Sequence, residues 1–314
     1  MSENQKQNDG QVETTGHAWD GGDLQEYNTP LPRWWLWAFY ATVVFAVIYW
    51  ILYPAWPIGD TYTKGISTIT YEVDGEERTS HWNTRARLMR DMQESPAAVR
   101  QQEFLDQVSG MEYEDVAADP DLMAFARSYG AGLFGDNCAA CHQTGGGGVI
   151  GLYPNLVDGE WYWGGDYETI ETTLRNGRAG FMQAFDDTLS DEEIHQVSSY
   201  VLSLSGHDVD EAAAAEGDEI FNGSVGGCFA CHGEGGTGQQ ALGAPNLTTE
   251  IWSIPDVHGR DTIEGKLEEI EQVVRRGVNT ADGFQREMPA FGERLSEEEI
   301  RMLTLYVRDL GGSL

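Results

Sequence analysis

The chain has 314 residues, of which 52 are acidic and 19 are basic, so its formal net charge is −33 at neutral pH. This acidity excludes a nucleic-acid binder, because phosphate contacts need clustered lysines and arginines. The length suits two domains or slightly more, and four cysteines are too few for a disulfide-stapled scaffold. Most acidic residues follow residue 53, where they either attract a cationic protein partner or simply keep the protein soluble.

An apolar segment at 34–53 follows a mostly polar, acidic N-terminal segment at 1–33. Its 20 residues carry no charge, and a helix of that length is about 30 Å long, which matches the hydrocarbon core of a bilayer. Tryptophan and tyrosine crowd both of its ends, as interfacial aromatic belts do. Because so many polar residues precede it, we interpret it as a retained transmembrane helix and not as a cleaved signal peptide.

The next segment, at 54–120, is predicted to be a connector. Its pattern indicates a strand-like run from Thr68 to Val73 and a polar helical stretch from about His81 to Gln107. We find no self-sufficient apolar face in it and no group of residues that carries chemistry.

The remaining chain contains one pattern written twice, which predicts two homologous domains at 121–207 and 208–314. Each copy is long enough to hold its own core, so a solenoid is not expected. In order, the first copy contains Gly130, Phe134, Cys138-Ala139-Ala140-Cys141-His142, Pro154-Asn155-Leu156, Gly177, Met182 and Ser190, and the second contains Gly217, Phe221, Cys228-Phe229-Ala230-Cys231-His232, Pro245-Asn246-Leu247, Gly277, Met288 and Ser296.

Helices are predicted at both ends of each copy. A closing helix begins at Ser190 or Ser296, where a glutamate three residues later completes a capping box. The opening helix carries a glycine and, four residues on, a phenylalanine on the same side, and the glycine allows a second helix to cross closely. The fold class is therefore mainly α.

The sequence Cys-x-x-Cys-His is the attachment signature of c-type haem. The two thiols reach the vinyl-derived carbons on one porphyrin edge, and the adjacent histidine is held under the ring to ligate iron. The two motifs use all four cysteines. A zinc site would need one tetrahedral set of ligands, and a thioredoxin-like redox pair would need a strand-helix context, so both alternatives are disfavoured.

A six-coordinate haem also needs a ligand on its opposite face. Met182 and Met288 recur at equivalent places, each in a Met-x-Ala-Phe loop before the closing helix, and a thioether there raises the haem potential. Proximity in the chain favours pairing of each methionine with its own copy, although an exchange between copies stays open. The carbonyls of Pro154 and Pro245 are candidates to accept the N–H of the ligating histidine. His258 is an alternative ligand in an insertion of the second copy.

The two repeats resemble class I cytochrome c domains, and the whole chain resembles the dihaem subunit III (CcoP, also called FixP) of cbb3-type cytochrome c oxidases. The specific part of this resemblance is N-terminal: it includes Thr15-Gly16-His17-Ala18-Trp19-Asp20-Gly21, Asn28-Thr29-Pro30-Leu31-Pro32-Arg33-Trp34-Trp35 and Tyr53-Pro54-Ala55-Trp56-Pro57. It implies two covalent haem c groups, one on Cys138 and Cys141 with His142, the other on Cys228 and Cys231 with His232, and Met182 and Met288 as the distal iron ligands.

The resemblance also implies a place for the chain in the cell. It would be a single-pass protein of the bacterial inner membrane, with a cytoplasmic N-terminus and periplasmic haem domains. It would relay electrons from a soluble or membrane-tethered cytochrome c, through a monohaem cytochrome c subunit, to the haem-copper subunit that reduces oxygen, and would itself be non-catalytic. The alternatives are a free-standing membrane-anchored dihaem shuttle and a dihaem peroxidase, and two matching methionine loops argue against the peroxidase.

Overall fold

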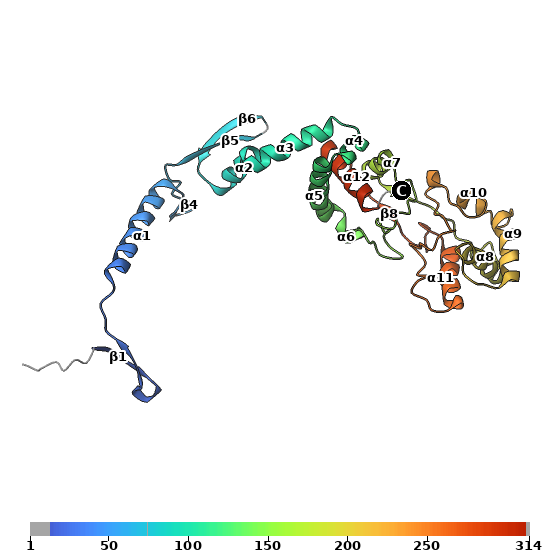
Figure 1. The fold of residues 1–314 in the computed structure, drawn as a ribbon, viewed down its shortest axis with the longest axis horizontal. Coiled ribbons are helices and arrows are strands. Elements are labelled where there is room, and N and C mark those ends of the chain that lie inside the picture. Colours follow the sequence, from blue (N-terminus) through green and yellow to red (C-terminus); the bar gives the residue numbers. More distant parts are fainter. Residues whose placement is uncertain (1–12, 74, 312–314) are drawn as a thin grey trace, which may run out of the picture. The chain divides into compact units, whose positions relative to one another are not determined.

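The computed structural model describes residues 13–73 and 75–311, which form two compact units that divide between Gln101 and Gln102 (Figure 1). The described residues are about half helical, and their strands form short two-stranded antiparallel sheets. Residues 1–12 of the predicted N-terminal segment at 1–33 lie outside the described residues.

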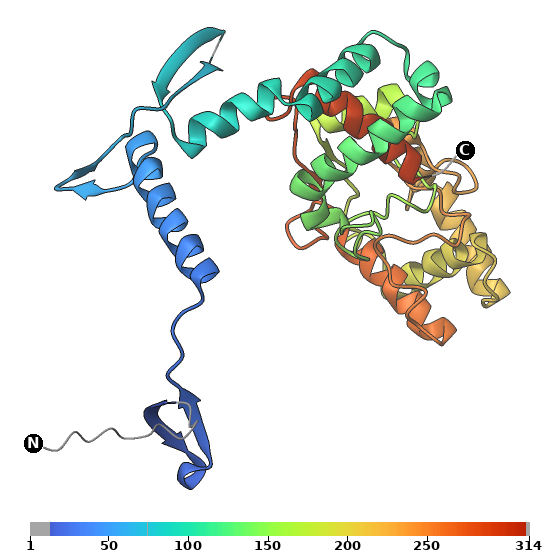
Figure 2. The same ribbon diagram turned by 60° about the vertical axis from the view of Figure 1, so that its left-hand side comes forward.

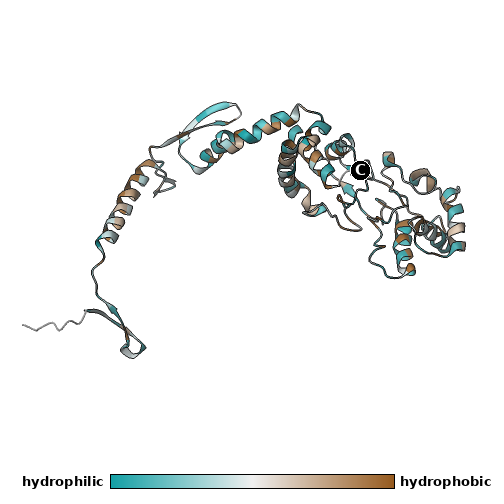
Figure 3. Ribbon diagram, in the orientation of Figure 1, coloured by the Kyte–Doolittle hydropathy of each residue, from teal (hydrophilic) through white to brown (hydrophobic). Residues whose placement is uncertain are grey.

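The first unit contains the predicted apolar helix. Helix α1 (Arg33–Leu52) ends before Pro54, and the helix predicted at 34–53 is therefore confirmed to within one residue. None of its residues is buried, and it is long and apolar enough to cross a membrane; its hydrophobic colouring stands out in Figure 3. The strands on either side of it are β1 (Thr14–Trp19), β2 (Leu24–Tyr27), β3 (Pro57–Ile58) and β4 (Thr61–Tyr62).

The predicted connector at 54–120 has the secondary structure that its pattern indicated. Strand β5 (Thr68–Val73) pairs with β6 (Glu76–His81), and the helices α2 (Thr84–Glu94) and α3 (Pro96–Ser109) follow, so the strand and the polar helical stretch are confirmed. Helix α2 begins where the side chain of Asn83 accepts a hydrogen bond from the backbone N–H of Ala86.

The end of this segment does have an apolar face, contrary to our expectation. Leu105 and Val108 of α3 and Val116 of α4 (Tyr113–Ala118) are buried in the same cluster as Met302 and Leu305. Because charged residues separate these apolar positions in the sequence, their shared helical face is easily overlooked. The last turns of the connector thus belong to the core of the second unit.

The second unit contains the two sequence repeats. The first repeat forms α5 (Pro120–Asn137), α6 (Ala139–His142), α7 (Tyr167–Asn176), β7 (Arg178–Ala179) and α8 (Asp191–Leu204). The second forms α9 (Glu211–Asn222), α10 (Phe229–His232), the 3-10 turn η2 (Gln240–Leu242), α11 (Ile263–Arg276), β8 (Glu287–Met288) and α12 (Glu297–Leu310). Both capping boxes are confirmed, at Ser190 with Glu193 and at Ser296 with Glu299.

The two repeats exchange their closing helices. Helix α12 packs against α5 and α7 of the first repeat, whereas α8 packs against α9 and α11 of the second, as the neighbouring red and green ribbons and the neighbouring yellow and orange ribbons show in Figure 2. The packing therefore differs from the local pairing that proximity in the chain favours. The repeat limits at 121–207 and 208–314 stay a prediction about the sequence, but the packed units do not follow them.

The helix crossings depend on the glycines of the opening helices. A Cβ atom on Gly130 of α5 would overlap Tyr306 of α12, and one on Gly217 of α9 would overlap the backbone of α8 and crowd Tyr200. The close crossing that the sequence predicts is thus present at both glycines. In each case the crossing helix, α12 at α5 and α8 at α9, comes from the other repeat.

The loops before the closing helices pair with each other across the repeats. Strand β7 pairs with β8, and Met182 exchanges two backbone hydrogen bonds with Val278, of 2.8 and 3.1 Å. Gly177 and Gly277 have φ values of +70° and +68°, and a Cβ on either would overlap the backbone carbonyl of the methionine of the other repeat. This reciprocal contact fixes where both methionine loops lie.

Candidate functional site

A single cavity of about 770 Å³ reaches both Cys-x-x-Cys-His motifs. This volume is within the usual range of ligand pockets, about 300–1,000 Å³. Apart from the alternative ligand His258, the residues that the sequence predicts for cofactor binding all line it: Cys138, Cys141, His142, Pro154, Met182, Cys228, Cys231, His232, Pro245 and Met288.

A short helical turn presents each motif to this cavity. In α6 the backbone N–H of His142 donates to the carbonyl of Cys138 at 2.9 Å, and in α10 that of His232 donates to the carbonyl of Cys228 at the same distance. Residues at i, i+3 and i+4 of a helix share one face, so two thiols and one imidazole face the cavity together. All four thiols are free.

The backbone orients both imidazoles. Nδ1 of His142 lies 3.0 Å from the carbonyl oxygen of Pro154, and Nδ1 of His232 lies 3.2 Å from that of Pro245. When Nδ1 carries the proton it donates to this carbonyl, and Nε2 keeps its lone pair for a metal ion. These contacts are the ones expected from the sequence, while the role of each side chain as an iron ligand stays a prediction.

Burial controls the protonation of the motif side chains. It lowers the pKa of His142 and of His232, which favours the neutral imidazole that ligates metals. It also raises the pKa of the Cys138 and Cys228 thiols to about 11 each, so both thiols are protonated at neutral pH. These four side chains therefore present neutral groups to the cavity.

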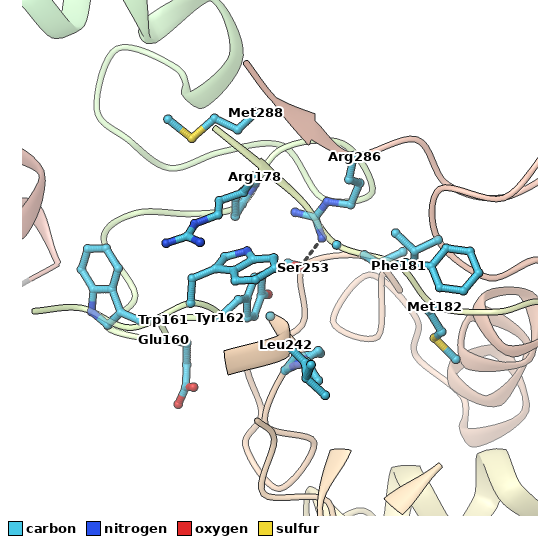
Figure 4. Close-up of a pocket in the computed structure, with 18 of the residues that line it drawn as sticks. Glu160, Trp161, Tyr162, Arg178, Phe181, Met182, Leu242, Ser253, Arg286 and Met288 are labelled. Atoms are coloured by element: carbon cyan, nitrogen blue, oxygen red, sulfur yellow. Dashed lines mark hydrogen bonds between the residues drawn. The ribbon is translucent and has the colours of Figure 1, made fainter. Parts of the chain in front are cut away.

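The methionines lie with the motif of the other repeat. Met288 packs against the core cluster that contains Cys138 and Phe134, and Met182 packs against the cluster that contains Phe221 and Cys228. Figure 4 shows their thioethers at separate places in the pocket, with the side chain of Arg286 between them. The exchange of closing helices thus carries each methionine across to the neighbouring motif.

Two tryptophans provide a test of whether a polar, flat group fits this cavity. Trp161 and Trp252 both line it, and the indole Nε1 atom of each is buried without a hydrogen-bond partner in the described chain. A buried donor without a partner is costly, so each indole is suited to an acceptor that the polypeptide does not supply. The carboxylates of a haem are such acceptors, and the residues present therefore fit the group.

Sequence reasoning missed these tryptophans, although a signal was available. Each stands five residues after the leucine of the Pro-Asn-Leu motif, Leu156 or Leu247, so a complete comparison of the repeats would have found them. It also missed Arg178 and Arg286, which line the cavity. These two arginines are not at equivalent positions of the repeats and so leave no repeated signal.

His258, the alternative ligand, does not line the cavity. Its Nε2 lies 2.6 Å from the backbone oxygen of Glu250, and its side chain is exposed. This contact explains the residue without a cofactor.

Two family models match the chain. The N-terminal domain of cytochrome oxidase-cbb3, FixP, matches residues 11–60, and the family described as cytochrome c oxidase, cbb3-type, subunit III, matches residues 126–201 and 212–307. The second match covers both cavity-lining motifs, and it identifies the class of the protein as one with cytochrome c domains.

Full-length relatives give the same result. The chain is 41% identical to a cbb3-type cytochrome c oxidase subunit CcoP of Cereibacter sphaeroides, over 98% of this chain and 97% of the relative. It is 40% identical to a subunit FixP of Azorhizobium caulinodans, over 95% and 93%, and 41% identical to one of Bradyrhizobium diazoefficiens, over 95% and 94%. The chain belongs to the family of subunit III of cbb3-type cytochrome c oxidases.

Proposed function

We propose that this chain is the electron-transfer subunit of a cbb3-type cytochrome c oxidase and carries two covalently attached haem c groups in two cytochrome c domains. It accepts electrons from a donor cytochrome c and passes them, through the monohaem cytochrome c subunit, towards the haem-copper subunit. The observation that carries this proposal is the pair of Cys-x-x-Cys-His turns on one cavity, each with its histidine held by a proline carbonyl.

The side chains divide the work of holding the cofactor. Cys138 and Cys141, and equally Cys228 and Cys231, tether it through thioethers, while His142 and His232 ligate iron through Nε2. Haem bound there supplies a reversible one-electron couple. Met288 completes the site at Cys138, and Met182 completes the site at Cys228, because the structure packs each methionine with the other motif. A methionine thioether would raise the reduction potential of a haem held there, as a carrier that takes electrons from another cytochrome c requires.

Helix α1 is then the membrane span, the one candidate among the described residues, with residues 1–33 in the cytoplasm and the cavity on the periplasmic side. Three properties of α1 support a lipid-facing helix: its length, its apolar composition, and the fact that none of its side chains is buried. Covalent attachment of haem takes place outside the cytoplasmic membrane, which supports this orientation. The acidic charge of the chain suits a basic donor protein.

The other two functions are less well supported. A free-standing dihaem shuttle would share the motifs and the span, but the N-terminal match to the oxidase family favours a subunit. A dihaem peroxidase needs a haem with an open or displaceable face, whereas a methionine packs with each motif here.

Purification from native membranes tests the proposal. The chain should retain haem after denaturation and extraction with acidified acetone, with two haem c groups per chain by the pyridine haemochrome spectrum, and it should copurify with a haem-copper subunit. Haem that leaves with the solvent would refute covalent attachment. A dihaem chain that copurifies with no oxidase subunit would favour the shuttle.

A further inference from the structure

Arg286 places a guanidinium in the cavity without an acidic partner. Its Nη1 donates to Oγ of Ser253 at 2.8 Å, and its side chain also contacts the hydroxyl of Tyr162. Among residues 13–73 and 75–311, no carboxylate forms an ion pair with it. Burial lowers the pKa of Arg286, as expected for a cation that has lost water and gained no anion.

Arg178 lies on β7, opposite Met288 of β8, and Arg286 stands two residues before that methionine. The Nε of Arg178 donates to Oγ1 of Thr173 at 2.9 Å, and its guanidinium stands 4.7 Å from the centre of the Trp163 ring. Within the described chain it too forms no ion pair with a carboxylate. Figure 4 shows the side chain of Arg286 between Met288 and Met182, and that of Arg178 below Met288.

A desolvated cation is stable only when it is paired, so these two arginines indicate that the cavity receives an anion. A guanidinium matches a carboxylate through two parallel hydrogen bonds. Haem carries two propionate carboxylates, which makes it the acceptor that this pair of arginines lacks.

The surroundings of Arg286 select one of the two sites. Tyr162, whose hydroxyl contacts Arg286, belongs to the first repeat, whereas Ser253 comes from the second. Arg286 itself stands two residues before Met288, which packs with Cys138, so we assign it to the site at Cys138. The equivalent positions around the motif at Cys228 hold small or apolar residues instead, namely Ser253 for Tyr162, Ile254 for Trp163 and Gly180 for Arg286. The positive charge therefore belongs to the site at Cys138 and has no counterpart at the other.

We propose that Arg286, together with Arg178, binds the propionate carboxylates of the haem at Cys138 and makes this haem the one with the higher reduction potential. The negative charge of the propionates stabilises ferric iron. A cation near them offsets this charge, so the ferrous state becomes relatively more stable and the reduction potential rises. Arg286 in this role contacts the haem carboxylates and does not ligate iron. The inference rests on the proposed function, since it needs haem at both motifs.

The test uses the full chain in detergent with its haem counted first. Arg286→Gln should lower the midpoint potential of one haem and leave the other in place, with a fall of at least tenfold in the reduction equilibrium, which is 59 mV for one electron. Arg286→Lys, which keeps the charge, should recover part of this shift. Arg178→Gln should shift the same haem. The propionate bending bands of the resonance Raman spectrum should change in the Gln variants.

Arg276→Gln is the matched control. Arg276 stands immediately before Gly277, which contacts the backbone carbonyl of Met182. Its side chain is exposed, donates to the backbone oxygen of Asp282 and does not line the cavity. It removes the same charge and should move neither potential.

Three results would overturn the inference: equal shifts of both haems, a shift as large in Arg276→Gln, or a shift in Arg286→Gln with unchanged propionate bands. If Arg286→Gln fails to accumulate, the Arg286→Lys and Arg178→Gln variants decide by the same two readouts. Wild-type protein without haem would instead refute the proposed function itself, so the two failures are distinguishable.

Discussion

The site at Cys138 and the site at Cys228 share the same ligand set and the same histidine contact, yet their walls differ. Both have a helical turn with two thiols, an imidazole held by a proline carbonyl and a buried tryptophan Nε1 without a partner. Only the first has a tyrosine, a second tryptophan and an arginine where the second has Ser253, Ile254 and Gly180. The repeated residues therefore define the chemistry, and the residues outside the pattern make the two sites unequal.

Removal of the thiols is the most drastic way to separate the sites. A Cys138→Ala, Cys141→Ala chain and a Cys228→Ala, Cys231→Ala chain should each retain one covalent haem instead of two, because each motif uses only its own cysteines. The pyridine haemochrome spectrum, normalised to protein, measures this number. Two haems on either variant would contradict the assignment.

The single-haem chains then test the exchange of methionines. In the Cys228→Ala, Cys231→Ala background, the added change Met288→Ala should remove methionine ligation of the haem at Cys138. The midpoint potential of that haem should then fall by more than 59 mV, which is a change of more than tenfold in its reduction equilibrium constant. Met182→Ala in the same background should leave that haem unchanged. Near-infrared absorption and a redox titration report both effects. The reverse result would restore pairing within each repeat.

The glycines that contact the methionine carbonyls should matter for stability in both sites. Gly177→Ala and Gly277→Ala each force a side chain into a positive φ and against a backbone oxygen, so each should cost at least about 1–3 kcal/mol of unfolding free energy. Denaturant unfolding followed at the haem absorption band measures the cost.

Gly147→Ala is a suitable control, because nothing lies within 4 Å of a Cβ at this position and its φ is not positive. It should change the unfolding free energy by no more than about 0.5 kcal/mol. Equal costs at all three glycines would show that the reciprocal contact does not stabilise the loops.

The features that both repeats share are the ones that the sequence predicts. The motifs, the capping boxes and the opening helices follow from local rules, since a thiol spacing or a Ser-x-x-Glu pattern acts within a few residues. The exchange of helices does not follow, because Tyr200 and Tyr306 occupy equivalent positions and either closing helix could cross either glycine. One signal was present in the six residues at 205–210 between α8 and α9: so short a link favours two neighbouring antiparallel helices.

The cavity wall was predictable only where the repeats agree. Trp161 and Trp252 share an offset from an already recognised motif, so their pairing could have been read from the sequence. Arg286 stands at a position that the other repeat fills with glycine, and an arginine in a loop is normally solvated. Only the packed structure shows that it is turned into the cavity.

The smallest expected difference concerns the ion pairs at the helix exchange. Arg175 at the end of α7 pairs with Glu171 and with Glu297 of α12, and Arg275 at the end of α11 pairs with Asp186 and with Asp191 of α8. Glu171 keeps 26% of its side chain exposed, whereas Asp186 and Asp191 keep 63% and 91%. Since water and salt screen exposed pairs more strongly, Arg175→Gln should lower the thermal midpoint more than Arg275→Gln does.

The salt dependence of these two variants separates the causes. At about 1 M salt the Debye length is about 3 Å, so the effect of Arg275→Gln should nearly vanish there. Part of the effect of Arg175→Gln should remain, because Glu171 is left partly buried without a cation and keeps only its hydrogen bond from the Tyr113 hydroxyl. If salt abolishes both effects equally, both ion pairs are screened like exposed pairs, and the difference in burial between the carboxylates has no energetic consequence.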